Sequence, residues 1–373
     1  MRIDHLSIAA IVSASLAQVG LADPLDASRV LGSKTCMTSG CHGGAGLDRG
    51  AHGIWKNYDP HFNAAATLGN GRSRAMAQEL KLESAAGSKS CTVCHSPLSD
   101  VDPAKLAPTA DAHGVDSGVS CASCHGPEEN WILSHTRPDY PKDALTKLGM
   151  RQLETAYQRA NNCVACHQNL SDELVGANHP PLVFELDGLL VAEPKHWREG
   201  KDFSHTKTWL VGQAVALREA AAQASREPGG RREAEIQAIS ALLKATATGW
   251  DDSRRDMVRA SDDYAKEISG STMAADQSRV ILRRLLSNRA PYEEGAFGGV
   301  DAEFRTWAVG YYSERLALAI DRLNQALGGE AVKKVFLDEL FDAAKPPKGF
   351  DTDASEAFMR KLDQLATSNP EAE

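Results

Sequence analysis

The eight cysteines of the chain constrain its fold more than any other feature. They form four pairs, and a histidine directly follows the second cysteine of each pair. The four motifs are Cys36, Cys41 and His42; Cys91, Cys94 and His95; Cys121, Cys124 and His125; and Cys163, Cys166 and His167. An even number of cysteines in an exported protein ordinarily indicates disulfides. Disulfides give no reason for a histidine after every pair, so the spacing favours another use of these thiols.

The last three motifs have the spacing Cys-x-x-Cys-His, which is typical of c-type haem attachment. Each thiol can form a thioether with one vinyl group of a haem, and the histidine can bind its iron as the proximal ligand. Zinc ribbons are the alternative, but zinc does not require a histidine after every pair. In the first motif four residues separate Cys36 from Cys41, a longer and rarer loop that Gly40 helps to fold tightly. The sequence therefore predicts four covalently bound haem c groups.

Seven further histidines outside the N-terminal segment are candidates for the sixth coordination position of an iron. They are His52, His61, His113, His135, His179, His196 and His205. An iron with two imidazole ligands transfers electrons, whereas an iron without a second protein ligand can bind a small molecule and support an enzyme. Whether every iron has a distal histidine therefore decides between an electron carrier and an enzyme.

Two segments resemble the tetrahaem cytochrome c554 family of ammonia-oxidising and related bacteria. One is Trp55-Lys-Asn-Tyr-Asp-Pro-His61-Phe-Asn-Ala, and the other is Gly118-Val-Ser-Cys-Ala-Ser-Cys-His-Gly-Pro127, followed by His135 and the fourth motif. The similarity extends over roughly residues 33 to 182. It implies a chain of mostly bis-histidine haems and partners in nitrogen-oxide metabolism.

The resemblance also implies particular distal ligands. By position, His61 would bind the iron of the third motif and His135 that of the first. His179, stiffened by the proline that follows it, is the natural candidate for the fourth. The family's second haem has no distal protein ligand, but here His113 precedes the third motif and could fill that position. His52 competes with His61 for its role, and His196 and His205 are the least favoured candidates.

The N-terminus and the overall charge bear on location and partners. Residues 1–22 combine Arg2, an apolar stretch from Leu6 to Leu16 and Gly20-Leu21-Ala22, which predicts a secretory signal peptide and a periplasmic protein. An ordinary N-terminal helix is the alternative. No other apolar run approaches the roughly 18 residues that span a bilayer. The formal net charge of −9 argues against nucleic-acid binding and favours partners with positive surface.

The composition and the hydrophobic pattern of the chain change near residue 204. Residues 23–203, rich in glycine and proline, are expected to form a tetrahaem cytochrome c domain of short helices and loops. Residues 204–345 are expected to form a helical bundle, and residues 346–373 a linker with a C-terminal helix or tail. Apolar residues at helical spacing predict helices near 204–226, 231–248, 252–269, 272–288, 301–327, 330–344 and 354–367. Strand patterns are almost absent, so the predicted fold class is all-α.

Three functions fit these features. The favoured one is a periplasmic electron carrier that works between redox partner proteins. The second is an oxidoreductase that acts on a small nitrogen or sulfur compound at an open haem iron, the second haem being the expected place. The third is a docking module whose C-terminal helices bind a larger complex or a second copy of the chain. No phosphate loop, nucleophile elbow or zinc-binding helix motif is present.

Overall fold

The computed structural model describes residues 28–47, 49–251, 253, 256–274, 276–329, 331–344 and 350–368. Helices and loops make up this part of the chain, and the only isolated β-bridge in it joins Val30 to Leu106. The predicted all-α fold is therefore confirmed. The expected signal peptide, residues 1–22, lies outside the described residues.

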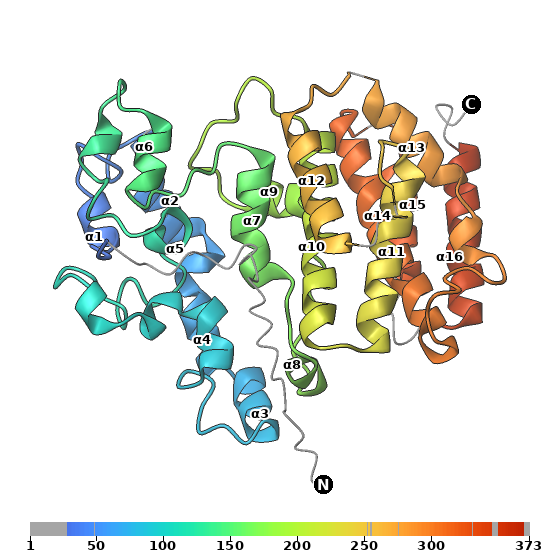
Figure 1. Ribbon diagram of the computed structural model, residues 1–373, viewed down its shortest axis with the longest axis horizontal. Helices are drawn as coiled ribbons and strands as arrows, with labels where there is room; N and C mark the ends of the chain where they lie inside the picture. Colours follow the sequence, from blue (N-terminus) through green and yellow to red (C-terminus); the bar gives the residue numbers. More distant parts are fainter. Residues whose placement is uncertain are drawn as a thin grey trace, which may run out of the picture.

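The N-terminal half consists of short helices, which lie on the left and in the centre of Figure 1. The α-helices are α1 (Ser33–Cys36), α2 (Ala51–Tyr58), α3 (Gly71–Glu79), α4 (Lys89–His95), α5 (Cys121–His125), α6 (Lys142–Lys147), α7 (Ala156–His167), α8 (Asp172–Gly176) and α9 (Leu186–Ala192). The 3-10 helices here are η1 (Pro60–Gly69), η2 (Pro97–Asp100), η3 (Pro103–Lys105) and η4 (Ser134–Thr136). Its own apolar clusters are small, as in the group formed by Val30, Leu98, Ala112 and Ala122.

The C-terminal half is a bundle of longer helices, on the right of Figure 1. They are α10 (His205–Arg226), α11 (Gly230–Thr246), α12 (Met257–Gly270), α13 (Gln277–Ser287), α14 (Arg305–Ala326), α15 (Lys334–Ala343) and α16 (Thr352–Ser368), with η5 (Ala290–Tyr292) and η6 (Ala302–Phe304) between them. All seven correspond to predicted helices. Four of them, α12 to α15, begin four or five residues later than predicted. For α12 the reason is that the Asp256 side chain accepts a hydrogen bond from the Arg259 amide and caps the helix there.

One large apolar core joins the two halves. It contains bundle residues such as Trp209 and Leu316, and also Val164 of α7 and Leu186 of α9. Figure 1 shows α7 and α9 between the N-terminal helices and α10. The expected boundary at residue 203 therefore separates helices that share a core, and the fourth motif, on α7, is anchored to the bundle.

Buried arginines add polar contacts to this core. Arg315 of α14 is 1% exposed and donates hydrogen bonds to the Phe184 carbonyl (3.3 Å), to Oε1 of Gln213 (3.0 Å) and to Oε1 of Glu235 (3.2 Å). The Phe184 carbonyl belongs to the segment that enters α9. Arg315 therefore ties the N-terminal half of the chain to α10, α11 and α14.

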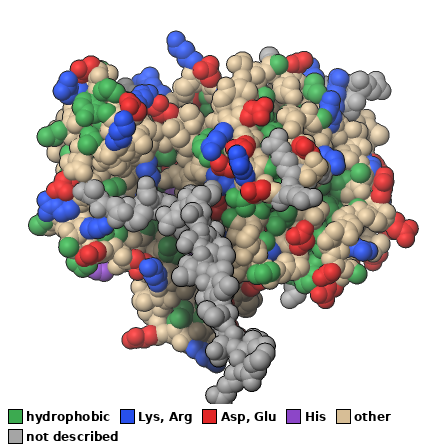
Figure 2. Space-filling model, viewed as in Figure 1, with side chains coloured by type: hydrophobic (Ala, Val, Ile, Leu, Met, Phe, Trp, Pro, Cys, Tyr) green, Lys and Arg blue, Asp and Glu red, His purple; other side chains and the backbone are tan. Residues whose placement is uncertain are grey.

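The face of the molecule seen in Figure 2 shows no single dominant charge. Lys and Arg side chains are interspersed with Asp and Glu side chains over the face seen in Figure 2. None of the described helices is both long and apolar enough to cross a membrane.

Candidate haem sites

Three of the four motifs lie on helices. The second ends α4, the third forms all of α5, and the fourth ends α7. On a helix, residues three and four positions apart share one face, so the two thiols and the imidazole of each Cys-x-x-Cys-His motif point to the same side. This geometry is what attachment to a single haem requires.

The longer first motif reaches a similar arrangement by a loop. Helix α1 ends at Cys36, and the chain then turns so that the His42 amide donates a hydrogen bond to the Cys36 carbonyl (3.0 Å). In a standard motif, the helical bond between residues four apart joins the same two positions. The extra residues therefore bulge out and leave His42 near the first cysteine.

The eight cysteines are all free thiols, and thiols of different motifs meet although none of them is fully buried. Cys36 is hydrogen-bonded to Cys121, and Cys94 is hydrogen-bonded to Cys166. Cys124 lies near enough to Cys163 to raise the pKa of that thiol further, although burial is the larger cause. The motifs thus adjoin one another in the order first, third, fourth and second.

Three of the four motif histidines face another imidazole. The ring centres of His42 and His135 are 6.3 Å apart, those of His167 and His61 are 5.9 Å apart, and those of His95 and His179 are 6.5 Å apart. A bond between a metal and an imidazole nitrogen is about 2 Å long, so two rings on opposite sides of one metal have centres about 6 Å apart. Each pair therefore has the spacing needed for two axial ligands of one iron.

The distal rings are also oriented by their second nitrogen. Nδ1 of His135 lies 2.6 Å from the Ile132 carbonyl, and Nδ1 of His179 lies 2.8 Å from the Pro180 carbonyl. Nδ1 of His61 lies 3.0 Å from Oδ1 of the buried Asp59. A histidine that binds a metal usually donates its other ring N–H to a carbonyl or carboxylate. These contacts leave Nε2 of all three rings available for a metal.

The four motif histidines are held in the form that binds a metal. Burial is the main cause that lowers the pKa of His42, His95 and His167, and it lowers the pKa of His125 to about 4. A neutral imidazole has the free lone pair that coordination needs. These residues are therefore suited to bind iron at neutral pH.

The pairing differs in two places from the one that the resemblance implies. His135 faces His42, as the resemblance implies. His61, however, faces His167 of the fourth motif instead of His125 of the third, because η1 lies against α4, which in turn contacts α7. His179 faces His95 of the second motif instead of the fourth.

Two of the remaining histidines have no such pairing. His113 is exposed in a turn in which the Gly114 amide donates a hydrogen bond to the Asp111 carbonyl, and no described ring contacts it. His52 packs on Trp55, with ring centres 5.6 Å apart, and its buried Nε2 has no hydrogen-bond partner among the described residues. The structure does not bring either residue opposite a motif histidine.

His205 forms a contact with a buried acid instead. Its Nδ1 lies 2.9 Å from Oδ1 of Asp187, which is fully buried at the start of α9. The neighbouring Glu185 is also buried and caps α9 by accepting hydrogen bonds from the amides of Asp187 and Gly188. The contact thus links the first residue of α10 to α9.

The contribution of these groups to stability falls as pH rises, between about 4.5 and about 7 for Glu185 and above about 6.5 for His205. Burial raises the pKa of Glu185 to about 7, so the folded chain keeps a proton that the unfolded chain releases. The hydrogen bond to Asp187 raises the pKa of His205, a contribution that is present below its unfolded pKa and is lost above its folded pKa. For Glu185 the loss is at most on the order of 3 kcal/mol.

Guanidinium denaturation across this range, followed by circular dichroism, would test the prediction. Relative to the unaltered protein, Glu185→Gln should lose the decrease in stability between about pH 4.5 and pH 7 that Glu185 contributes, because glutamine does not titrate. Asp262→Asn is a control, since its bonds to Lys266, Tyr157 and Arg218 lower the pKa of Asp262 and make it act at lower pH. The same pH dependence in Glu185→Gln as in the unaltered protein would contradict the assignment.

Sequence reasoning missed the acidic groups beside His61. Asp59, His61 and Glu193 each offer a possible ligand atom, and these atoms lie within 4.8 Å of one another. The contact with Asp59 was visible in the segment Asp59-Pro-His61, whereas Glu193 comes from the end of α9, far along the chain. Together they form the polar surroundings of the ring that faces the fourth motif.

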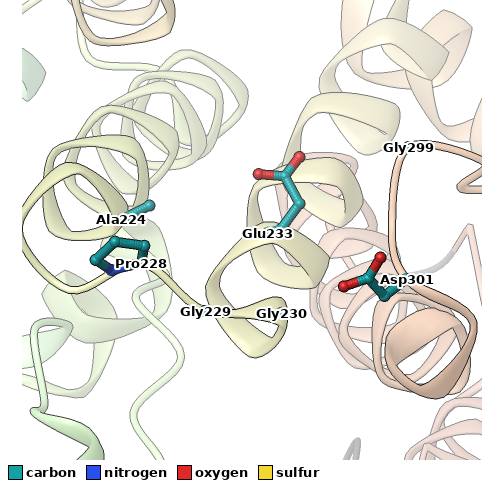
Figure 3. Close-up of a pocket in the computed structure, with 7 residues that line it drawn as sticks. All are labelled: Ala224, Pro228, Gly229, Gly230, Glu233, Gly299 and Asp301. Carbon is teal, nitrogen blue, oxygen red and sulfur yellow. The ribbon is translucent and has the colours of Figure 1, made fainter.

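The described residues also form a pocket away from the motifs. Figure 3 shows it at the turn between α10 and α11, with Glu233 and Asp301 among its lining residues. No cysteine or histidine lines it. It is therefore not part of the candidate haem sites.

Comparison with known proteins agrees with this geometry. Residues 76–168 match the family model for cytochrome c7 and related cytochrome c. This range includes the second, third and fourth motifs. No similar curated protein and no similar solved structure was found. The match supports a multihaem c-type cytochrome that functions in electron transfer and carries covalently bound haem c, and it does not single out the c554 family.

Proposed function

We propose that this protein is a periplasmic tetrahaem c-type cytochrome that transfers electrons between redox partner proteins. The family match supports the class, and the four motifs and the N-terminal segment support the number of haems and the location. Each bound haem iron supplies one-electron redox chemistry. The chain contributes the attachment points, the axial ligands and the surroundings that tune the potentials.

The order of the motifs is the observation that carries this proposal. Contacts between Cys36 and Cys121, and between Cys94 and Cys166, bring motifs together in pairs. The nearness of Cys124 to Cys163 links the two pairs. Haems attached at adjoining cysteines would lie close to one another, so electrons could pass from the first motif to the second through the third and the fourth.

The axial ligands also favour a carrier. We assign His135, His61 and His179 as the distal ligands for the irons held by His42, His167 and His95. The three pairs have the ring spacing of two axial imidazoles, and Nδ1 of each distal ring is already hydrogen-bonded. Two imidazoles leave an iron without a position for a substrate.

The resemblance to the c554 family suggests redox partners in nitrogen-oxide metabolism. A net charge of −9, before the haem propionates are added, favours a partner with a positive surface. The C-terminal helices are the proposed surface for a second copy of the chain. The family match alone implies neither these partners nor association with a second copy.

The alternative is an oxidoreductase for a small nitrogen or sulfur compound. One observation favours it, because His125 has no facing ring among the described residues at the spacing of the other three pairs. The third motif, not the second, would then provide the open iron. Whether the iron of the third motif has a distal ligand therefore decides between an electron carrier and an oxidoreductase.

Expression in a bacterium that matures c-type cytochromes would test the proposal. The intact mass should equal that of the processed chain plus four haems. The reduced protein should be reoxidised by small redox proteins with a positive surface, and it should not turn over nitrite, hydroxylamine or sulfite. Fewer than four haems, or turnover of one of these compounds, would contradict a tetrahaem carrier.

A further inference from the structure

The segment that follows the fourth motif is held by the C-terminal bundle. Gln168, the residue after His167, donates a hydrogen bond from Nε2 to the Ala216 carbonyl of α10 (2.7 Å). Asn169 donates one from Nδ2 to Oε2 of Glu219 (3.0 Å), one turn further along the same helix. The chain therefore leaves α7 in contact with α10.

Two arginines at the start of α11 hold the next residues. Nη2 of Arg232 donates a hydrogen bond to the Leu170 carbonyl (2.7 Å) and lies 3.3 Å from Oδ1 of Asp172. Nη2 of Arg231 donates a hydrogen bond to the same oxygen. Such bonds between a guanidinium and a carboxylate are charge-assisted and stronger than neutral ones. Because Asp172 is the first residue of α8, these contacts fix the start of that helix, which Figure 1 shows beside the turn from α10 to α11.

Helix α8 sets the position of His179. The Ser171 side chain caps the helix by accepting a hydrogen bond from the Leu174 amide (3.2 Å). The His179 amide donates a hydrogen bond to the Leu174 carbonyl (3.0 Å). Between them Asn178 has φ of +67°, in the left-handed region that asparagine tolerates better than most residues. His179 therefore keeps a fixed place relative to α8.

The chain beyond His179 is also held by the bundle. Pro180 and Pro181 follow, and their rings restrict the backbone. Phe184 is fully buried in the large core, and its carbonyl accepts a hydrogen bond from Nη1 of Arg315 (3.3 Å). The loop that carries His179 is thus anchored to α11 on one side and to α14 on the other.

The two imidazoles that face each other at the second motif have different supports. His95 ends α4, which packs against η1, η2 and α7 of the N-terminal half. His179 lies opposite, with ring centres 6.5 Å apart, and is held through α8 by the bundle. A displacement of α8 would therefore move His179 away while His95 keeps its place.

We infer that Arg231 and Arg232 are positioning residues for the distal ligand of the second iron. A guanidinium has no free lone pair for a metal, so both act through α8. The inference rests on the proposed function, in which His95 and His179 bind the same iron. It gives the bundle, which lies outside the matched range 76–168, a role in haem ligation.

Replacing both arginines by alanine should open the second iron. The reduced Arg231→Ala/Arg232→Ala variant should bind carbon monoxide at one more iron than the unaltered protein. The oxidised variant should lose one low-spin signal from its electron paramagnetic resonance spectrum. His179→Ala should produce the same changes, and adding it to the double variant should open no further iron, because replacements that act on one ligand are not additive. The mass should show the same number of haems in every variant.

Arg289→Ala is the matched control for a general loss of stability. Arg289 pairs with Asp363 of α16 at 2.5 Å, and the two side chains are 29% and 62% exposed. The side chains of Arg231 and Asp172 are 17% and 58% exposed, so the two pairs are similar. The control pair lies away from α8, and its loss should leave carbon monoxide binding unchanged.

Asp172→Ala removes the same contact from the side of α8, at a residue that is more than half exposed, and serves if the double variant does not fold. It should also open the second iron, whereas Asp172→Asn keeps an acceptor oxygen and should open it less. Unchanged carbon monoxide binding in these variants beside a gain in His179→Ala would overturn the inference, as would an equal gain in Arg289→Ala. No gain in His179→Ala would instead overturn the axial pair of the proposed function, and the inference with it.

Discussion

Replacing Arg315 by alanine should lower the free energy of unfolding by about 3 to 5 kcal/mol. The guanidinium is 1% exposed, and its bonds to Gln213, Glu235 and the Phe184 carbonyl cross several helices. Removal of one partner from a buried ion pair leaves the other charge without compensation in a medium of low dielectric. The shift in the guanidinium denaturation midpoint of the haem-loaded protein measures the loss.

A surface pair provides the matched control. Arg360 forms a 3.7 Å pair with Glu356 one turn away on α16, and both side chains are more than half exposed. Arg360→Ala should change the stability by less than about 0.5 kcal/mol. The double replacement Arg315→Met with Glu235→Leu should recover most of the loss, because it removes both charges. A loss below about 1 kcal/mol in Arg315→Ala would show that the buried pair contributes little.

The sequence predicted the bundle well because helical periodicity is a local property. The stripe that includes Tyr312, Leu316 and Leu323 predicted a helix over residues 301–327, and α14 covers Arg305–Ala326. The same periodicity could not show that α7 and α9 complete the bundle core, because that depends on which distant segments pack together. Val164 and Phe184 lie among haem-binding features in the sequence and are nevertheless buried in the large core.

The motifs were likewise visible in the sequence, whereas the partners of their histidines were not. Spacing alone identifies Cys163, Cys166 and His167 as a set, because the three residues lie on one helix. Which ring faces His167 depends on how η1 packs near α4 and α7. The sequence does not show this packing, and the resemblance therefore assigned His61 to a different motif.

Replacing both Cys163 and Cys166 by serine should leave three haems and interrupt the electron path. The fourth motif connects the pair formed by the first and third motifs to the second motif, through Cys124 on one side and Cys94 on the other. In the proposed arrangement His61 and His167 share the iron of this haem, so its loss would isolate the second motif. Electron exchange between the second haem and the others after rapid photoreduction, followed by visible absorption, should slow strongly.

The second motif offers a control at the end of the same order. Replacing Cys91 and Cys94 by serine should also remove one haem by mass, but the first, third and fourth motifs should still exchange electrons at the unaltered rate. The two variants lose the same number of thioethers and differ only in the position of the missing haem. Equal exchange rates among the remaining haems in both variants would mean that the fourth motif is not the link, and the order inferred from the cysteine contacts would then be wrong.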